Sequence, residues 1–296
     1  MTKRISTAVA VLGAAGMISG CNLEQPSAGC IVQDATDWTA KYTLKDQAQA
    51  TTSCGKLTGE QLGVFKYINP NATAEQKAQS MGSKLAIRPN GQASLTTFVY
   101  PIQDSNDDDT AAFYPNGKPV LTTHEESRLQ GTATPADATN MSGTFTEQPD
   151  DESMCTANGF TETRVAAKEI VFTPPHGFGD EVRVPAQTAE YLFKDVQVYS
   201  DPSAPGTQLR GTLVYGDGTG CKAEYEVWAL WPTVACETDA DCGEGSGLNP
   251  DFDVKCDTTL NNVVVVDEED YGRTKIYAAG VCAPARRPPS FKPTKS

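Results

Sequence analysis

Two histidines and many carboxylates are the side chains of this sequence that could carry out catalysis. His124 lies in a Thr-His-Glu-Glu run, and His176 follows two prolines in a glycine-rich stretch. A histidine that acts as a general base needs a nucleophile or a substrate proton within hydrogen-bond reach. Neither histidine belongs to a Gly-x-Ser-x-Gly or His-Glu-x-x-His motif, which would supply such a partner. We therefore assign no catalytic residue, and an enzyme is the less favoured interpretation.

Oxygen-rich clusters could instead bind Ca²⁺, which prefers carboxylate and carbonyl ligands. Asp104, Asn106 and Asp108 stand at alternate positions, as in the first half of a calcium-binding loop. The pattern then fails, because Asp109 replaces the turn glycine and Pro115 replaces the bidentate glutamate. A solvated acidic loop is the alternative. A second candidate oxygen cluster comprises Asp239, Asp241 and either Asp251 or Asp253.

The N-terminal residues have the profile of a secretory signal peptide. Lys3 and Arg4 are positively charged, and residues 5–20 contain no charged side chain. The apolar part is shorter than the roughly 20 residues that span a bilayer as a helix. We therefore predict a signal peptide over residues 1–20.

The end of this segment, Ile18-Ser19-Gly20-Cys21, resembles the lipobox of bacterial lipoproteins. The resemblance implies diacylation of the Cys21 thiol, cleavage before Cys21, and acylation of the new amino group with a chain such as palmitate. Two or three acyl chains anchor a protein stably to a membrane. Asn22 is not the aspartate that resembles an inner-membrane retention signal, so the outer membrane is favoured. An ordinary signal peptide that happens to precede a cysteine is the alternative.

Nine cysteines are present, and lipidation of Cys21 would leave an even number for pairing. Exported proteins meet an oxidising compartment, where an even number of cysteines indicates disulfides. The paired Cys-x-x-Cys spacing of zinc modules is absent from this sequence. We expect four disulfides of open connectivity among Cys30, Cys54, Cys155, Cys221, Cys236, Cys242, Cys256 and Cys282.

The chain of 296 residues is acidic, with a formal net charge of −14. This balance argues against nucleic acid as a partner and against electrostatic docking on anionic lipid. The acidic net charge is explained by the solubility that an exported protein needs.

Short period-two patterns predict an all-β fold. Trp38, Ala40, Tyr42 and Leu44 alternate with polar residues. Residues 209–215 and 221–231 form the clearest hairpin, joined by the glycine-rich 216–220. Pro89-Asn90-Gly91 predicts another turn, between strands at 84–88 and 93–100. Residues 73–81 are the one helical candidate, with a cap at Thr73. We predict an antiparallel β-sandwich or barrel.

Cys236-Glu237-Thr238-Asp239-Ala240-Asp241-Cys242-Gly243 resembles a motif of exported cysteine-rich bacterial proteins, which implies a small disulfide knot. Val-rich residues 261–267 and residues 274–281 could pair as strands. The last residues contain prolines, basic residues and Phe291, a composition typical of disorder. The predicted organisation is signal peptide 1–20, tether 21–34, β domain 35–232, disulfide-rich segment 233–282 and disordered basic tail 283–296.

Trp228 is the one strand aromatic that alternation places on a polar face, so it is a ligand-binding candidate. The other aromatics on these strands, such as Tyr191, Phe193 and Tyr225, fall on the core side. We predict a lipid-anchored envelope protein that acts by binding or structure, with a glycan or envelope protein as partner. A hydrolase of glycan or peptide is the alternative, since its chemistry needs only two carboxylates about 5–9 Å apart.

Overall fold

A computed structural model describes residues 29–102, 122–172, 181–260, 265–270, 273–277 and 280–293. The strands pair antiparallel in every sheet of this part, which confirms the all-β prediction. The signal peptide, Cys21, His176 and the acidic candidates Asp104, Asn106 and Asp108 lie outside the described residues. His124 lies in a described strand, but its side chain is not described. No helix of the described part is long and apolar enough to cross a membrane.

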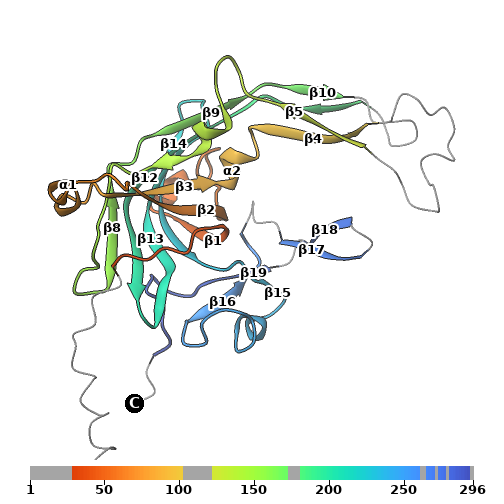
Figure 1. Cartoon of the computed structure of the whole chain (residues 1–296). Coiled ribbons are helices and arrows are strands. Elements are labelled where there is room, and N and C mark those ends of the chain that lie inside the picture. The colour runs from red at the N-terminus through yellow and green to blue at the C-terminus, as the bar shows by residue number, and fades with distance from the viewer. Residues whose placement is uncertain are drawn as a thin grey trace, which may run out of the picture.

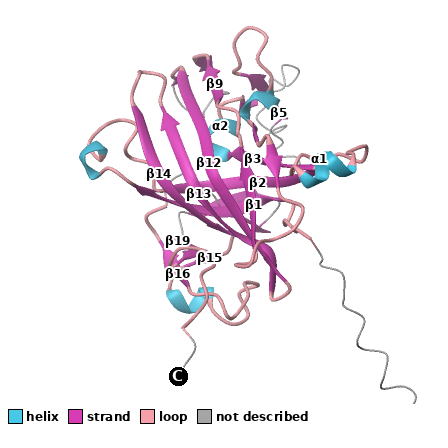
Figure 2. Ribbon diagram, turned by 90° about the vertical axis from the view of Figure 1, so that its left-hand side faces the viewer, coloured by secondary structure: helices cyan, strands magenta, loops and turns pink. Residues whose placement is uncertain are grey.

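The main sheet closes on itself, so the sandwich-or-barrel alternative resolves to a barrel (Figures 1 and 2). The strand order is β13-β14-β1-β2-β3-β7-β8-β12-β9, and β12 also pairs with β13 to complete the ring. The strands are β1 (Ala35–Leu44), β2 (Gly59–Ile68), β3 (Ser83–Pro89), β6 (Asn140–Met141), β7 (Thr144–Phe145), β8 (Met154–Asn158), β9 (Thr163–Ala167), β12 (Gln187–Asp201), β13 (Ala204–Gly216) and β14 (Lys222–Leu230).

The barrel interior is filled by alternate side chains of these strands. In β14, Tyr225 and Val227 are buried, whereas Lys222 and Glu224 are exposed. The predicted hairpin of β13 and β14 is present, with Leu213 opposite Tyr225. Because successive side chains of a strand point to opposite faces, this period fixes which residues form the core. The largest fully buried side chains include Trp38, Tyr191, Tyr225, Phe145 and Phe193.

The helices are short. α1 (Ala74–Ala78) begins at Thr73, whose side chain accepts a hydrogen bond from Gln76 in a capping box, so the predicted helix is confirmed. α2 (Asn90–Ala93) occupies the stretch predicted to be a hairpin turn, and this prediction was wrong. β3 pairs with β2 and β6 instead of with the strand that follows. The part of the chain that the structure describes also contains the 3₁₀ turns η1 (Gln47–Gln49), η3 (Pro135–Ala138) and η4 (Asp239–Cys242).

Two small sheets extend away from the barrel at the upper right of Figure 1. One pairs β4 (Thr97–Ile102) with β5 (Thr122–Ser127), and the other pairs β10 (Ile170–Phe172) with β11 (Val182–Val184). The rings of Phe98 and Phe172 lie 5.3 Å apart. The two sheets therefore share a contact between their aromatic side chains.

A separate small sheet forms beside the barrel from the cysteine-rich segment. Its order is β15 (Ala235–Cys236), β19 (Gly280–Pro284), β16 (Val254–Asp257). The expected strand pair 261–267 and 274–281 corresponds to β17 (Val265–Asp270) and β18 (Arg273–Tyr277). All eight expected cysteines pair, as Cys30–Cys155, Cys54–Cys221, Cys236–Cys256 and Cys242–Cys282.

The last residues of the expected tether are fixed to the barrel. The Ile31 amide donates to Ser200 Oγ at 2.9 Å, and the Gln33 amide donates to the Gly206 carbonyl at 3.0 Å. Lys66 Nζ donates to the Cys30 carbonyl at 2.7 Å. Residues 30–33 therefore belong to the folded body, and the tether predicted over residues 21–34 does not extend to residue 34. The composition did not show this, because distant residues supply the partners.

The basic tail, expected to be disordered, is bonded to the folded body as far as Lys292, whose amide donates to the Asp251 carbonyl at 2.8 Å. Ser290 is buried and its amide donates to Gln208 Oε1 at 2.6 Å. Phe291 lies edge-on against Tyr199 and Phe252, with ring centroids 5.5 and 5.4 Å away. Arg287 pairs with Glu226 at 3.5 Å. The ring contacts of Phe291 and the ion pair of Arg287 with Glu226 hold this segment in place. Its proline-rich composition did not predict these contacts.

We predict that the double variant Cys30→Ser/Cys155→Ser loses about 2–5 kcal/mol of unfolding free energy, since this bridge closes a long loop. Chemical denaturation followed by tryptophan fluorescence measures the loss. Cys236→Ser/Cys256→Ser is the control, because this bridge lies outside the barrel ring. Its two cysteines are separated by 20 positions in the sequence, so the loop that it closes is shorter. An unchanged midpoint for Cys30→Ser/Cys155→Ser would contradict the prediction.

Candidate functional site

A pocket of about 610 Å³ opens at one end of the barrel, where β12 begins and β13 ends. Ligand pockets are typically about 300–1,000 Å³, so a small molecule or a few sugar units would fit. α2 and the residues after it contribute to the lining, and so does the turn after β13. We call this the mouth pocket; it is lined by Leu57, Gly91, Ser94, Leu95, Gln130, Ala167, Ala186, Gln187, Thr188, Ala189, Tyr191, Tyr215, Asp217, Gly218 and Thr219.

A buried carboxylate, Glu60, lies directly behind this lining. Glu60 is fully buried, and Oε1 accepts hydrogen bonds from the hydroxyls of Tyr42 and Tyr191, both at 2.9 Å. Oε2 accepts a hydrogen bond from the Gly91 amide at 2.6 Å. These donors come from β1, β12 and α2, so one carboxylate joins three elements around the pocket. We call these four residues the Glu60 cluster.

Burial shifts the ionisation of the whole cluster. It raises the pKa of Glu60 from 4.5 to about 7, although the Gly91 amide and the two tyrosine hydroxyls favour the charged form and oppose the shift. Burial, followed by the Glu60 charge, also raises the pKa values of Tyr42 and Tyr191 well above 10. Glu60 therefore changes its charge near neutral pH, whereas both tyrosines stay protonated.

Gly91 is required for a close approach rather than for a hairpin. A Cβ atom at this position would lie 2.6 Å from the Tyr191 hydroxyl and 3.1 Å from Glu60 Oε2. The next residue, Gln92, is buried and its side chain donates to the carbonyls of Ala189 and Thr163 at 2.9 and 3.2 Å. The Asn90-Gly91 sequence thus belongs to a helical turn that packs against Glu60 and β12.

The pocket surface combines hydroxyls, amides and the side chains of Tyr191 and Tyr215. Asp217 is the one carboxylate among its described lining residues, and hydrogen bonds from Ser53 and Thr219 lower its pKa. Burial first, and then the Asp217 and Glu60 charges, raise the pKa of Tyr215. Since Glu60 is sealed behind the wall, the described lining residues present no second carboxylate that faces Asp217.

The described calcium candidates serve as local caps. Asp239 Oδ1 accepts the Cys256 amide at 2.9 Å, and Asp241 Oδ2 accepts the amides of Glu237 and Thr238 at 2.9 and 2.8 Å. These bonds hold the 3₁₀ turn η4 in place and lower the pKa of Asp241. The sulfurs of Cys236, Cys242 and Cys282 lie close together, but each is in a disulfide and so offers no thiolate to a metal.

Trp228 lies on the outer face of the barrel, as its alternation predicted. Its cross-strand neighbours are Lys41 and Arg210. Lys41 Nζ bonds Asp257 at 2.6 Å, and Arg210 donates to the Pro288 carbonyl at 2.8 Å. Both neighbours are thus bonded to the C-terminal segment, and Trp228 is partly buried beside it. Among the described residues, Trp228 Nε1 is a buried donor without a hydrogen-bond partner.

Sequence reasoning missed Glu60, although a signal was present. Glu60 has the same parity as Leu62 and Val64 in β2, and both of these side chains are buried. A charged residue at an inward position of a strand needs partners, because a buried unpaired carboxylate is costly. The partners are the hydroxyls of Tyr42 and Tyr191, whose side chains lie on the core side of their strands.

We predict that Glu60→Gln gains on the order of 3 kcal/mol of stability relative to the wild type as pH rises from 4.5 to above 7, in addition to a pH-independent loss because the glutamine NH2 group cannot accept a hydrogen bond. The folded-state pKa is above the unfolded value, so the stability that protonated Glu60 contributes is full below pH 4.5 and is lost as pH rises through about 7. Urea unfolding of both proteins across this range measures the difference. The exposed Glu125→Gln is the control; a difference that does not grow with pH would refute the assignment.

Known proteins provide a family for this barrel, although no solved structure matches the chain. A protein of Myxococcus xanthus named "Putative lipoprotein MlpA" is 32% identical over 306 residues, which cover 99% of this chain and 100% of the relative. The MlpA family model matches residues 36–232, from the first barrel strand, β1, to just beyond β14. This chain therefore belongs to the MlpA family.

Proposed function

We propose that this protein is a lipid-anchored binding protein of the cell envelope, attached through Cys21, with the mouth pocket as its ligand site. The observation that carries the proposal is the mouth pocket with the Glu60 cluster behind its wall. The anchor is supported by Ile18-Ser19-Gly20-Cys21 and by the lipoprotein name of the relative. The outer membrane is the favoured location because Asn22 follows the cysteine.

The chain entrance, which leads to the proposed anchor, and the mouth pocket lie at opposite ends of the barrel. β12 begins at the pocket with Gln187 and ends near Ser200, which accepts the Ile31 amide. β13 runs the opposite way, from Gly206 beside Gln33 to Tyr215 in the pocket. The chain thus enters the barrel at the end opposite to the mouth pocket. An anchor at Cys21 would leave the pocket facing away from the membrane.

The chemistry of the lining favours a neutral, hydroxyl-rich ligand. Ser94, Thr188, Thr219 and Tyr215 offer hydroxyls, and the glutamines offer amides. The Tyr215 ring and nearby alanines provide apolar contacts of the kind that a sugar ring uses. A glycan segment matches both features. Catalysis by paired carboxylates gains no support from the described lining residues, since Asp217 alone faces the pocket.

We predict that Cys21→Ala abolishes membrane attachment, because the acyl chains would have no thiol to modify. Cell fractionation with detection of the protein, and mass spectrometry of its N-terminus, measure the change. Cys30→Ser is the matched control, since it removes a nearby cysteine and leaves the lipobox intact. Membrane attachment of Cys21→Ala at the wild-type level would refute the anchor.

We predict that Ser94→Trp, which places a large side chain at the rim of the mouth pocket, strongly reduces binding on a glycan array. Ser94 is exposed in the structure, so the fold should tolerate the change. Thr43→Trp, on the outer face of β1, is the control for non-specific effects. Equal loss in both variants, or no glycan bound by the wild type, would contradict the assignment.

A further inference from the structure

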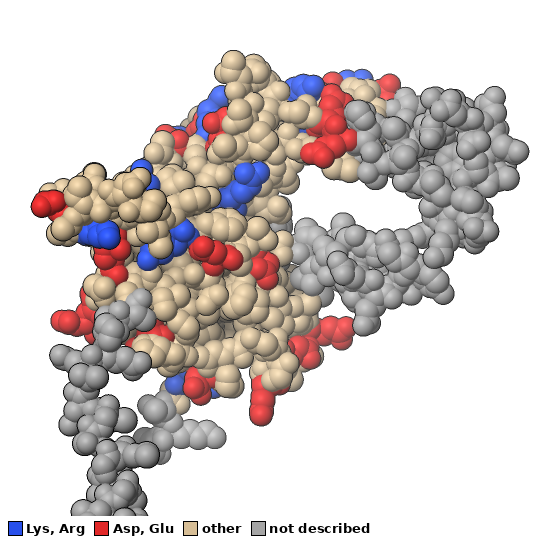
Figure 3. All heavy atoms as spheres, viewed as in Figure 1, with Lys and Arg blue, Asp and Glu red and all other residues tan. Residues whose placement is uncertain are grey.

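Glu60 is enclosed by the protein, unlike the carboxylates at its surface. Figure 3 shows acidic side chains on the outer face of the described part, where water can exchange protons with them. Glu60 has no exposed surface, and both of its oxygens accept hydrogen bonds from protein donors instead. Two of these partners, Gly91 and Tyr191, also line the mouth pocket. The charge of Glu60 therefore acts directly on two residues of the candidate ligand site.

The partners of Glu60 are all donors, which suits an ionised carboxylate. The hydroxyls of Tyr42 and Tyr191 donate to Oε1, and the Gly91 amide donates to Oε2. An ionised carboxylate only accepts hydrogen bonds, whereas a protonated carboxyl group must also donate one. The Gly91 amide cannot take that bond, because a backbone N–H is itself a donor. The arrangement of the Glu60 cluster is therefore that of the charged form.

Protonation of Glu60 requires one of the two tyrosine hydroxyls to accept a hydrogen bond instead of donating it. A hydroxyl that accepts the Glu60 proton must turn its own proton away from the carboxyl group. Within the described part of the chain, the hydroxyls of Tyr42 and Tyr191 have no hydrogen-bond partner other than Glu60. The turned proton would lie in the barrel core without an acceptor, and an unpaired buried donor is costly. Movement of Tyr191 or Gly91 away from protonated Glu60 avoids this cost.

The hydrogen bond between the Gly91 amide and Glu60 also depends on the charge. Hydrogen bonds to an ionised acceptor are roughly twice as strong as those between neutral groups. This bond, 2.6 Å long, attaches the start of α2 to β2. The next residue is held whatever the charge, because the Gln92 side chain donates to the Ala189 and Thr163 carbonyls. Loss of the charge therefore loosens α2 at Gly91 without releasing the whole turn.

The other ionisable groups around Glu60 keep their charge near neutral pH. Those that face the barrel interior from the neighbouring strands are Tyr42 of β1, Tyr191 of β12, Tyr215 of β13 and Tyr225 of β14. Burial raises the pKa of each tyrosine above its ordinary value of 10. α2 contains no ionisable side chain, and Arg88 of β3 bonds the Pro135 carbonyl instead. Within the described residues, no basic side chain is among the groups that shift the pKa of Glu60.

We propose that Glu60 is a pH-sensitive switch of the mouth pocket. Ionised Glu60 holds Gly91 and Tyr191 in the arrangement that binds the ligand, and protonated Glu60 releases them, so binding weakens in acid. The proposal rests on the proposed function of this pocket as the ligand site, and it adds the condition under which the site is formed. A protein of the cell envelope meets the pH of its surroundings, so it would release its ligand when they become acidic.

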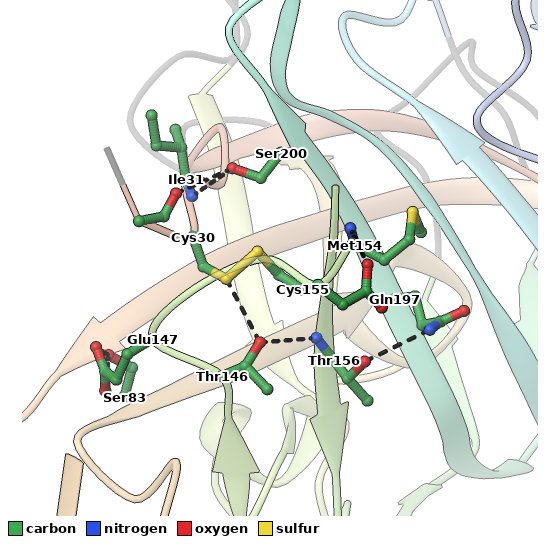
Figure 4. Close-up of a disulfide and its surroundings, with 12 residues drawn as sticks. Cys30, Ile31, Ser83, Thr146, Glu147, Met154, Cys155, Thr156, Gln197 and Ser200 are labelled. Carbon is green, nitrogen blue, oxygen red and sulfur yellow. Dashed lines mark hydrogen bonds between the residues drawn. A yellow bond between two sulfur atoms is a disulfide. The ribbon is translucent and has the colours of Figure 1, made fainter. Parts of the chain in front are cut away.

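Hydrogen exchange of the full mature lipoprotein, followed by mass spectrometry, tests the switch without a ligand. The exchange rate of the Gly91 amide is divided by that of the Thr156 amide in the same sample, so the intrinsic pH dependence of exchange cancels. The Thr156 amide is a suitable reference because it donates to the Thr146 hydroxyl beside the disulfide in Figure 4. We expect the ratio to rise several-fold from about pH 8.5 to about pH 5.5, on either side of the Glu60 pKa of about 7.

Three variants make the exchange measurement decisive. Glu60→Gln, which like the protonated acid brings a donor into the cluster, should give the high ratio at both pH values. Tyr42→Phe removes a hydroxyl that favours the charged form and lies outside the pocket lining, so the midpoint should move to higher pH. Tyr225→Phe is its matched control, because that hydroxyl donates to the Cys54 carbonyl, and its midpoint should equal that of the wild type. A wild-type ratio that is constant with pH, or equal midpoints in the two tyrosine variants, would overturn the switch.

The glycan array described above, run at the same two pH values, tests the consequence for binding. We expect the wild-type signals to fall several-fold in acid. His124→Gln/His176→Gln should show the same fall, since the two histidines are the other side chains whose ordinary pKa lies in this range. Equal signals at both pH values would overturn the switch. Absence of any bound glycan would contradict the proposed ligand, and exchange at Gly91 would still decide whether Glu60 controls the pocket.

Discussion

Strand β12 is the constraint on which the rest of the structure depends, because its pairing on both edges closes the sheet. It pairs with β13 along one edge and with β9 and then β8 along the other. The partners change around Asp195, which has a positive φ of 49° and lies in a break of the β13 register between Lys194 and Gln197. A bulge of this kind increases strand twist and lets a sheet curl into a barrel. One strand thus links Tyr191 at the mouth to Ser200 at the chain entrance.

The parts of this fold that local pattern governs could be predicted, and the parts that distant contacts govern could not. The β13–β14 hairpin and the Thr73 cap depend on neighbouring residues, so periodicity and capping identified them. The packed tail depends on Phe291 meeting Tyr199 and Phe252, which no local pattern encodes. The same limit applied to Glu60: its inward parity was visible, but its partners lie on β1, β12 and α2. The even number of cysteines predicted that they form disulfides, but it did not predict which cysteines pair.

The Glu60 cluster raises the question of why a barrel core contains a carboxylic acid. An apolar side chain of the same size would avoid the desolvation that raises the Glu60 pKa to about 7. What such a side chain could not do is accept hydrogen bonds at once from Tyr42, Tyr191 and Gly91. These bonds fix the depth of α2 against β2 and β12, and α2 forms a wall of the mouth pocket. The carboxylate therefore lowers the stability of the fold at neutral pH, but its hydrogen bonds fix the shape of the pocket.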